Sequence, residues 1–311
     1  MKSLRNICCV ILTALLVPAM ISLHAFAGTS MKFRHMMSIY TDGKPDDKQV
    51  KLNRPDGVTF NSDGTLIVSD TGNGRLLKYI YKDDALSTQI FEIKVPEISY
   101  PVRAQINSKG DIYVLDGKQR RIIRLTGSGT FKGYLDPSGV PSPATYVPKN
   151  FFIDGNDNIY ILDVFSQRIL ILNSDGTYRK HIAFPENYGF ISDFAVDVKG
   201  VVFLIDSVNA MVFSTANSNA TFMPLTEQLK QYVRFPTCIL IDKNGRIYLL
   251  DRNGGSIIML GQNGSFLGRM SGPGWKDGRM IHPSQIALGN NDEIFVADTH
   301  NSRVQIFKAM E

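Results

Sequence analysis

The sequence predicts an all-β protein with the architecture of a six-bladed β-propeller. Six blocks of similar length follow one another along nearly the whole chain. Each block consists of short runs rich in Val, Ile, Leu, Phe and Tyr, separated by turns of Asp, Asn, Ser and Gly, which is typical of antiparallel hairpins. Several blocks contain a fourth run after a further turn. Four antiparallel strands per repeat indicate a propeller blade rather than a helical solenoid unit.

Three columns of residues set the register of the repeat. The second run of each block ends at Asp70, Asp116, Asp163, Asp206, Asp251 and Asp298, in steps of 46, 47, 43, 45 and 47 residues. Fifteen residues earlier, near the start of each blade, stand Pro55, Pro101, Pro148, Ile191, Pro236 and Pro283. Five residues later stand Arg75, Arg121, Arg168, Met211, Ser256 and Arg303. A period of this size, kept in six copies, predicts one blade per copy.

We expect these columns to be structural. Proline suits the first residue of a strand because it has no N–H to donate. An Asp carboxylate at the end of a strand can accept the backbone N–H groups of the turn that follows. The Arg beyond that turn can pair with the Asp, a contribution of about 1 kcal/mol or less if the pair is exposed. A feature repeated in every blade indicates a structural role rather than catalysis.

The ring is expected to close through its two ends. The sixth block stops after its third run, near Lys308, and therefore lacks an outer strand. The segment Lys32–Tyr40 precedes the first block and is a strand candidate that belongs to none of the six. We predict that it becomes the outer strand of the last blade, which would leave no unpaired seam.

The first 27 residues are typical of an export signal. Lys2 and Arg5 are followed by an apolar stretch, and the Ala-Phe-Ala sequence ending at Ala27 fits a cleavage site before Gly28. Residues 28–311 then form a single propeller domain, exported to the periplasm or the extracellular space. Contact with a membrane is expected only if the leader stays uncleaved as an anchor.

Charge and cysteine content exclude some classes of function. The formal net charge is +5, and loss of Lys2 and Arg5 with the leader gives 5 − 2 = +3. No long basic run accompanies this charge, so nucleic acid is not an expected partner. Cys238 is the only cysteine after the leader and lies in an apolar run. We expect it to be an inert buried thiol, with no disulfide in the fold.

Two loops carry the clearest version of the repeat. The first copy reads Asp-Thr-Gly-Asn-Gly-Arg at residues 70–75, and the last reads Asp-Thr-His-Asn-Ser-Arg at residues 298–303. With the preceding proline, this pattern resembles the NHL repeat over nearly all of residues 52–308. The resemblance implies a six-bladed propeller that often serves as a binding platform for proteins or ligands, and some relatives are enzymes.

The two residues after each position of the Pro column should surround one mouth of the central channel. This ring consists of Asp56-Gly57, Val102-Arg103, Lys149-Asn150, Ser192-Asp193, Thr237-Cys238 and Ser284-Gln285. It is polar and mixed in charge. Two interpretations stay open, a funnel for a ligand or the hydrated lining that any channel needs. The loops between blades share this face, which is therefore the expected working face.

Trp275 is the only tryptophan and lies in a Gly-rich loop beside Arg279. An aromatic side chain next to cations on a loop is typical of a contact site for a partner. The alternative is that Trp275 fills the groove between the last two blades.

Two metal enzymes resemble the pattern in part. The NHL-type lyase that completes peptide amidation holds zinc with channel histidines after strand-opening prolines, and no histidine stands there in this chain. Calcium-dependent lactonase-type propellers use acidic and amide residues, which Asp56, Asn150 and Asp193 could imitate. The two Asp residues belong to opposite blades, however, and Ca²⁺ needs its oxygens at about 2.3–2.6 Å.

These observations predict an exported, non-enzymatic scaffold that binds a protein or small ligand on the face of the channel mouth. The expected contact residues are Asp56, Arg103, Lys149, Asp193, Trp275 and Arg279. No catalytic residue, metal ligand or cofactor is assigned. The alternative is a metal-assisted lyase or hydrolase of the lactonase type, with Ca²⁺ as the candidate ion. A third interpretation is an accessory subunit of a cell-envelope complex.

Overall fold

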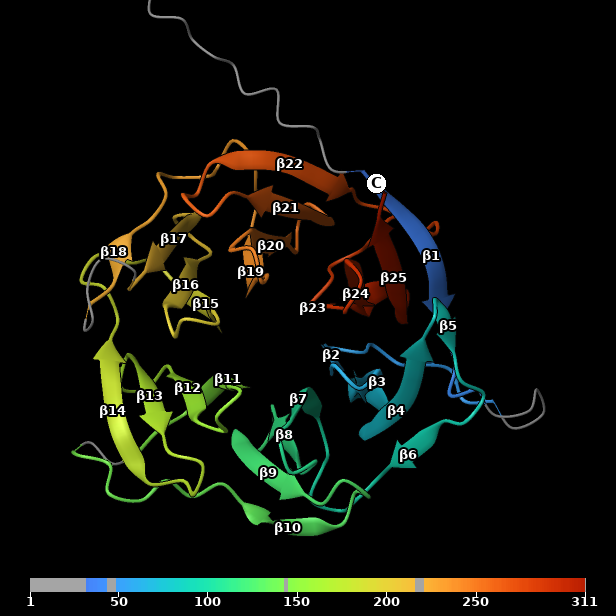
Figure 1. Ribbon diagram of the computed structural model, residues 1–311, viewed down its shortest axis with the longest axis horizontal. Helices are drawn as coiled ribbons and strands as arrows, with labels where there is room; N and C mark the ends of the chain where they lie inside the picture. The colour runs from blue at the N-terminus through green and yellow to red at the C-terminus, as the bar shows by residue number, and fades with distance from the viewer. Residues whose placement is uncertain (1–31, 44–48, 143–144, 216–220, 311) are drawn as a thin grey trace, which may run out of the picture.

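The computed structural model describes residues 32–43, 49–142, 145–215 and 221–310, and the predicted leader lies outside them. Six antiparallel sheets stand around a central axis, which confirms the predicted six-bladed propeller (Figure 1). Among the described residues, no helix has the length and apolar character needed to cross a membrane.

Each blade runs from an innermost to an outermost strand, and the strand bounds follow the repeat closely. Blades one to three contain β2 (Gly57–Phe60), β3 (Thr65–Asp70), β4 (Arg75–Lys82), β5 (Ala85–Leu86) and β6 (Phe91–Ile93); β7 (Pro101–Ile106), β8 (Ile112–Asp116), β9 (Arg121–Leu125) and β10 (Phe131–Tyr134); and β11 (Pro148–Ile153), β12 (Ile159–Asp163), β13 (Arg168–Leu172) and β14 (Tyr178–Ala183). Blades four to six contain β15 (Ile191–Val196), β16 (Val202–Asp206), β17 (Met211–Ser214) and β18 (Met223–Pro224); β19 (Pro236–Ile241), β20 (Ile247–Asp251), β21 (Ser256–Leu260) and β22 (Phe266–Ser271); and β23 (Gln285–Leu288), β24 (Glu293–Asp298), β25 (Arg303–Ala309) and β1 (Phe33–Ile39). Short 3₁₀ turns, η2 (Thr71–Asn73) and η3 (Thr299–Asn301), follow the Asp in the first and last blades.

The N-terminal strand closes the ring as predicted. Strand β1 pairs antiparallel with β25, from Phe33 opposite Ala309 to Ile39 opposite Val304. Figure 1 shows this strand, in blue, along the outer edge of the last blade. The loop before blade six reinforces the contact, because the Asp277 carboxylate accepts hydrogen bonds from Ser38 on β1 and from Arg303 on β25.

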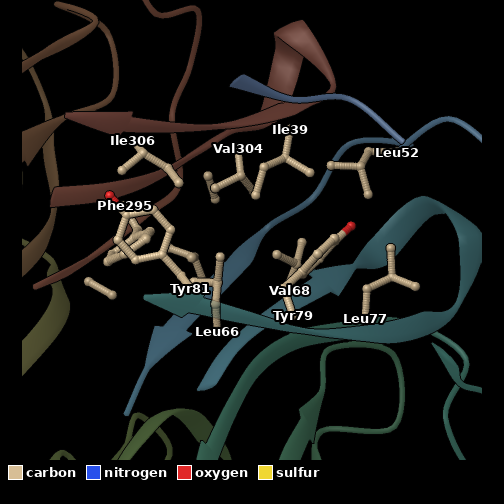
Figure 2. Packing of buried hydrophobic residues seen from close by; sticks show 13 residues of the cluster. Ile39, Leu52, Leu66, Val68, Leu77, Tyr79, Tyr81, Phe295, Val304 and Ile306 are labelled. Atoms are coloured by element: carbon tan, nitrogen blue, oxygen red, sulfur yellow. The ribbon is translucent and has the colours of Figure 1, made fainter. Parts of the chain in front are cut away.

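The hydrophobic core lies between neighbouring blades, and the seam where the ring closes is packed like the rest. There, Phe295 of blade six stacks on Phe60 of blade one at 4.7 Å between ring centroids and meets the edge of Tyr81 at 5.2 Å. Figure 2 shows Phe295 and Tyr81 together with Ile39 of β1. Full burial of a large apolar side chain contributes about 1.5–3 kcal/mol, so the closing strand and the seam stabilise each other.

The Asp column holds two segments of each blade together. Asp206 accepts N–H hydrogen bonds from Val208 and Asn209 in the following turn, as predicted, and also from Gly189 and Phe190 in the segment that enters the blade. Burial raises the pKa of the Asp206 carboxyl, but these hydrogen bonds lower it more, and the net shift is downward. The repeated Asp is therefore a buried side chain that joins the segment entering the blade to the turn after the second strand.

The predicted pairing of the Arg column with the Asp column is present in three blades, and these pairs are buried. Arg75, Arg168 and Arg303 donate to their Asp partners at 2.8, 3.0 and 2.8 Å, and all three side chains are buried. Removal of one partner from such a pair leaves an uncompensated buried charge, which costs far more than the loss of a surface pair. Arg121 differs, since its guanidinium lies 3.6 Å from the centroid of the Tyr134 ring.

Candidate functional site

A pocket of about 210 Å³ lies at one mouth of the central channel. Its lining contains every member of the predicted ring except Gly57, and one further residue, Arg252. The predicted position of the ring is therefore confirmed. Of the six expected contact residues, the structure brings four together in this pocket, namely Asp56, Arg103, Lys149 and Asp193.

Irregular strand starts help to direct these side chains to the channel. In the pairing of β7, β11, β15 and β19 with the next strand, the register shifts between the residue of the Pro column and the residue two positions later. Such a shift is typical of a β-bulge, which re-aims a side chain at the edge of a sheet. The shifts precede Arg103, Asn150, Asp193 and Cys238 directly, so the repeat itself builds the polar ring.

Asp193 is the buried acidic centre of the pocket. One carboxylate oxygen accepts the Ile239 N–H of the next blade at 3.0 Å, and the other accepts the side-chain amide of Asn150. The same oxygen lies 3.8 Å from Nη1 of Arg103. Asp193 therefore links three successive blades to one another, from blade three to blade five.

Glutamines link other innermost strands in the same way. Gln285 accepts the Val58 N–H at 3.0 Å, and Gln105 accepts the Ile153 N–H at 2.8 Å. Both side chains are buried. Sequence reasoning missed Gln105 because it lies four residues beyond the Pro column, outside the expected ring.

Arg103 is buried but poorly paired. Its exposed fraction is 8%, and Nε has no hydrogen-bond partner among the described residues. Its ion pair with Asp193, at 3.8 Å, is longer than a hydrogen bond. Since guanidinium carries five N–H donors, Arg103 brings a charge and unused donors to the pocket.

Burial shifts the pKa values of three other ionisable side chains of the pocket. Lys149 is exposed at the rim, yet desolvation lowers the pKa of its ammonium, while the nearby Asp193 opposes the shift. Burial also raises the pKa of the Asp56 carboxyl, although Arg252 opposes this. The pKa of the Cys238 thiol is raised well above its usual value by burial, which agrees with an inert buried thiol.

The two blades that meet at the closing seam decide the family. The model of the NHL repeat matches residues 52–79 in the first blade and 281–307 in the last. The six sheets of the ring give the architecture in which these two repeats stand. The protein is a six-bladed β-propeller with NHL repeats in its first and last blades. No curated protein matches its sequence.

Solved structures share the fold of the NHL propeller at low identity. A streptogramin B lyase is 15% identical, with a TM-score of 0.60 over 91% of this chain and 99% of the lyase. A gluconolactonase from Xanthomonas campestris is 11% identical, with a TM-score of 0.63 over 91% of each chain. A chain of a nidogen–laminin complex is 15% identical, with a TM-score of 0.55 over 72% of this chain and 88% of that one. These likenesses establish the fold alone.

The Asp193 carboxylate, the main candidate ligand for a metal ion in the channel, is already engaged by protein groups. Ca²⁺ takes six to eight oxygens, but the Asp193 carboxylate is engaged by Asn150 and Ile239, with the Arg103 cation beside it. No three His, Cys, Asp or Glu side chains gather as metal ligands within the described ranges. His282 and His300 contact each other at 3.2 Å, but neither lines the pocket.

The loop that carries Trp275 forms a second feature, separate from the pocket. The Trp275 side chain is 72% exposed, so the interpretation that it fills a groove between blades is wrong. The loop is held firmly, because the Arg303 guanidinium donates to the carbonyl oxygens of Lys276 and Arg279 at 2.9 and 2.8 Å. Neither Trp275 nor Arg279 lines the channel pocket.

Proposed function

We propose that this NHL propeller is an exported, non-enzymatic binding protein whose ligand site is the polar channel mouth. The observation that supports this most is the convergence of the ring. All six blades contribute polar or charged side chains to one pocket. A lining that only needed hydration would not require a buried arginine with unused donors, since buried polar groups are normally paired.

The state of the charged groups favours binding over proton transfer. Asp193 is engaged through both carboxylate oxygens, and Asn150 donates to one of them while its own oxygen accepts the Phe151 N–H at 2.7 Å. Groups fixed in this way can position a ligand. A general base, by contrast, must be able to reach the proton that it abstracts.

The size of the pocket limits the ligand. Drug-sized ligands occupy pockets of about 300–1,000 Å³, whereas this pocket has about 210 Å³. It suits a small metabolite or a single side chain of a protein partner. In the second case the exposed Trp275 would add a further contact, as expected for an accessory subunit of an envelope complex.

A thermal-shift panel of neutral sugars, amino acids, organic acids and cations tests the proposal. The variant Thr237→Phe fills the pocket, and Thr130→Phe adds the same ring at an exposed position away from it. We expect at least one compound class to raise the melting temperature of the wild type and of Thr130→Phe but not of Thr237→Phe. Equal shifts in all three proteins, or none in any, would reject the channel mouth as the ligand site.

One observation favours an enzymatic alternative. The Asn150 amide and the Asp193 carboxylate meet in the pocket, and the solved structures with this fold include a lyase and a gluconolactonase. A lactone-hydrolysis assay with and without added Ca²⁺ tests this alternative. Turnover that is lost in Asp193→Asn would support an enzyme, and background rates in both conditions would support the binding function.

A further inference from the structure

We propose that the channel-mouth pocket binds a small carboxylate, held chiefly by Arg103 and Lys149. This inference rests on the proposed function, because it names the ligand class of the same site. It is carried by three features of the pocket, namely unused donors, an excess of positive charge and a second unpaired polar atom.

The first feature is the guanidinium of Arg103. The residue is 92% buried (100% − 8%), its Nε has no partner among the described residues, and its counter-ion lies at 3.8 Å. A buried donor without a partner costs about 1–3 kcal/mol. A carboxylate is the planar acceptor that can take two parallel N–H donors from guanidinium, so a bound carboxylate would remove this cost.

The second feature is the charge balance of the pocket. Arg103, Lys149 and Arg252 are basic, and Asp56 and Asp193 are acidic, which gives 3 − 2 = +1. The Lys149 ammonium lies 5.0 Å from the centroid of the Phe190 ring and hydrogen-bonds to no described residue. One added carboxylate neutralises this excess, whereas a phosphate dianion would exceed it.

The third feature is the hydroxyl of Thr237. This oxygen is buried and unpartnered among the described residues, although the residue lines the same pocket. A hydroxyl can both donate and accept, so it can serve a second polar group of the ligand. A short hydroxy acid would match both the guanidinium and this hydroxyl.

Calorimetric titration in a low-salt, chloride-free buffer tests the inference. Lactate is the probe, lactamide is its neutral analogue, and inorganic phosphate is the competing oxyanion. We expect lactate to bind, lactamide to bind at least tenfold more weakly and phosphate to bind more weakly than lactate. Arg103→Gln should weaken lactate binding about tenfold or more, in line with the loss of a charged hydrogen bond.

Three further variants make the test specific. Lys149→Met should weaken lactate binding several-fold, whereas Lys276→Gln, which removes a charge from the Trp275 loop, should leave it unchanged. Arg103→Lys keeps the charge but removes the planar guanidinium, which can donate two parallel hydrogen bonds to a carboxylate. This variant should also bind lactate weakly. It serves as the second variant if Arg103→Gln does not fold.

The inference is overturned if lactate and lactamide bind equally, if phosphate binds and lactate does not, or if the folded Arg103 variants bind like the wild type. In those cases a neutral compound that binds the wild type but not Thr237→Phe would still uphold the proposed function. If no compound of any class depends on the pocket, both proposals fail.

Discussion

The two mouths of the channel are built from the same innermost strands but differ in chemistry. The mouth at the strand starts is the polar pocket that contains Arg103 and Asp193. The opposite mouth, a pocket of about 250 Å³, is lined largely by apolar side chains such as Phe60, Phe152 and Leu288. Arg103 and Gln285 line both pockets. They therefore lie between the polar and apolar parts of the channel.

The difference shows how one repeat separates stability from binding. The far ends of the strands continue the core, as Phe60 does by stacking on Phe295. The near ends carry charges that are incompletely paired, which is costly for stability and useful for ligand recognition. The comparison predicts that substitutions at the apolar mouth change stability alone, whereas substitutions at the polar mouth change binding as well.

Removal of the strand that closes the ring should have the largest effect on stability, because both mouths of the channel depend on a closed ring. Deletion of residues 32–40 removes β1, leaves the outer edge of β25 unpaired and uncovers the seam. We expect the free energy of unfolding to fall by about 4 kcal/mol or more and the melting temperature by about 10 °C or more. Calorimetry measures both, with the exposed Arg34→Ala as a control. An unchanged melting temperature would show that the ring does not depend on this strand.

At the polar mouth, Asp193→Asn should lower the stability of the protein and raise its affinity for lactate. The change removes the counter-charge of Arg103 and raises the formal charge of the pocket by one. We expect a loss of about 3 kcal/mol in unfolding free energy, together with tighter lactate binding. Lactate should then raise the melting temperature of the variant more than that of the wild type. A smaller rise in the variant would mean that Asp193 supports the ligand directly.

At the apolar mouth, Phe60→Ala should affect stability only. Phe60 is half-buried and stacks on Phe295, so its loss should cost about 2 kcal/mol, less than for a fully buried phenylalanine. Lactate affinity should stay within twofold of the wild-type value in titration calorimetry. A large loss of affinity would show that the two mouths are coupled.

The smallest effect should be a pH dependence of binding that only the polar mouth can produce. Desolvation lowers the pKa of Lys149 from its usual value of 10.5. Since the protonated ammonium attracts the carboxylate, lactate affinity should decline as the pH rises through this lowered pKa. Titrations at increasing alkaline pH measure the decline, which should be absent in Lys149→Met. The same decline in that variant would assign it to another group.

The fold and the position of the site could largely be predicted from the sequence, because both depend on the repeat. The Asp column set the blades, and a fixed offset from the Pro column placed Asp56, Arg103, Lys149 and Asp193 at one mouth. Arg252 escaped prediction because it follows Asp251 directly, at a position where the other five blades carry no charged residue.

Other properties depend on packing between blades, which no single repeat reveals. The sequence predicted the pairs of Arg75 and Arg303 with their Asp partners but not their burial, which depends on loops from elsewhere in the chain that cover them. The exposure of Trp275 depends on how Arg303 fixes its loop. The incomplete pairing of Arg103 also needed the structure, since it depends on a distance to Asp193 on another blade.

A crystal structure determined from crystals grown with saturating lactate tests most directly the claim that the polar mouth binds a carboxylate. It should show lactate at the polar mouth, with its carboxylate on the Arg103 guanidinium and near the Lys149 ammonium. Lactate at the apolar mouth or on the Trp275 loop, with only water beside Arg103, would contradict the account.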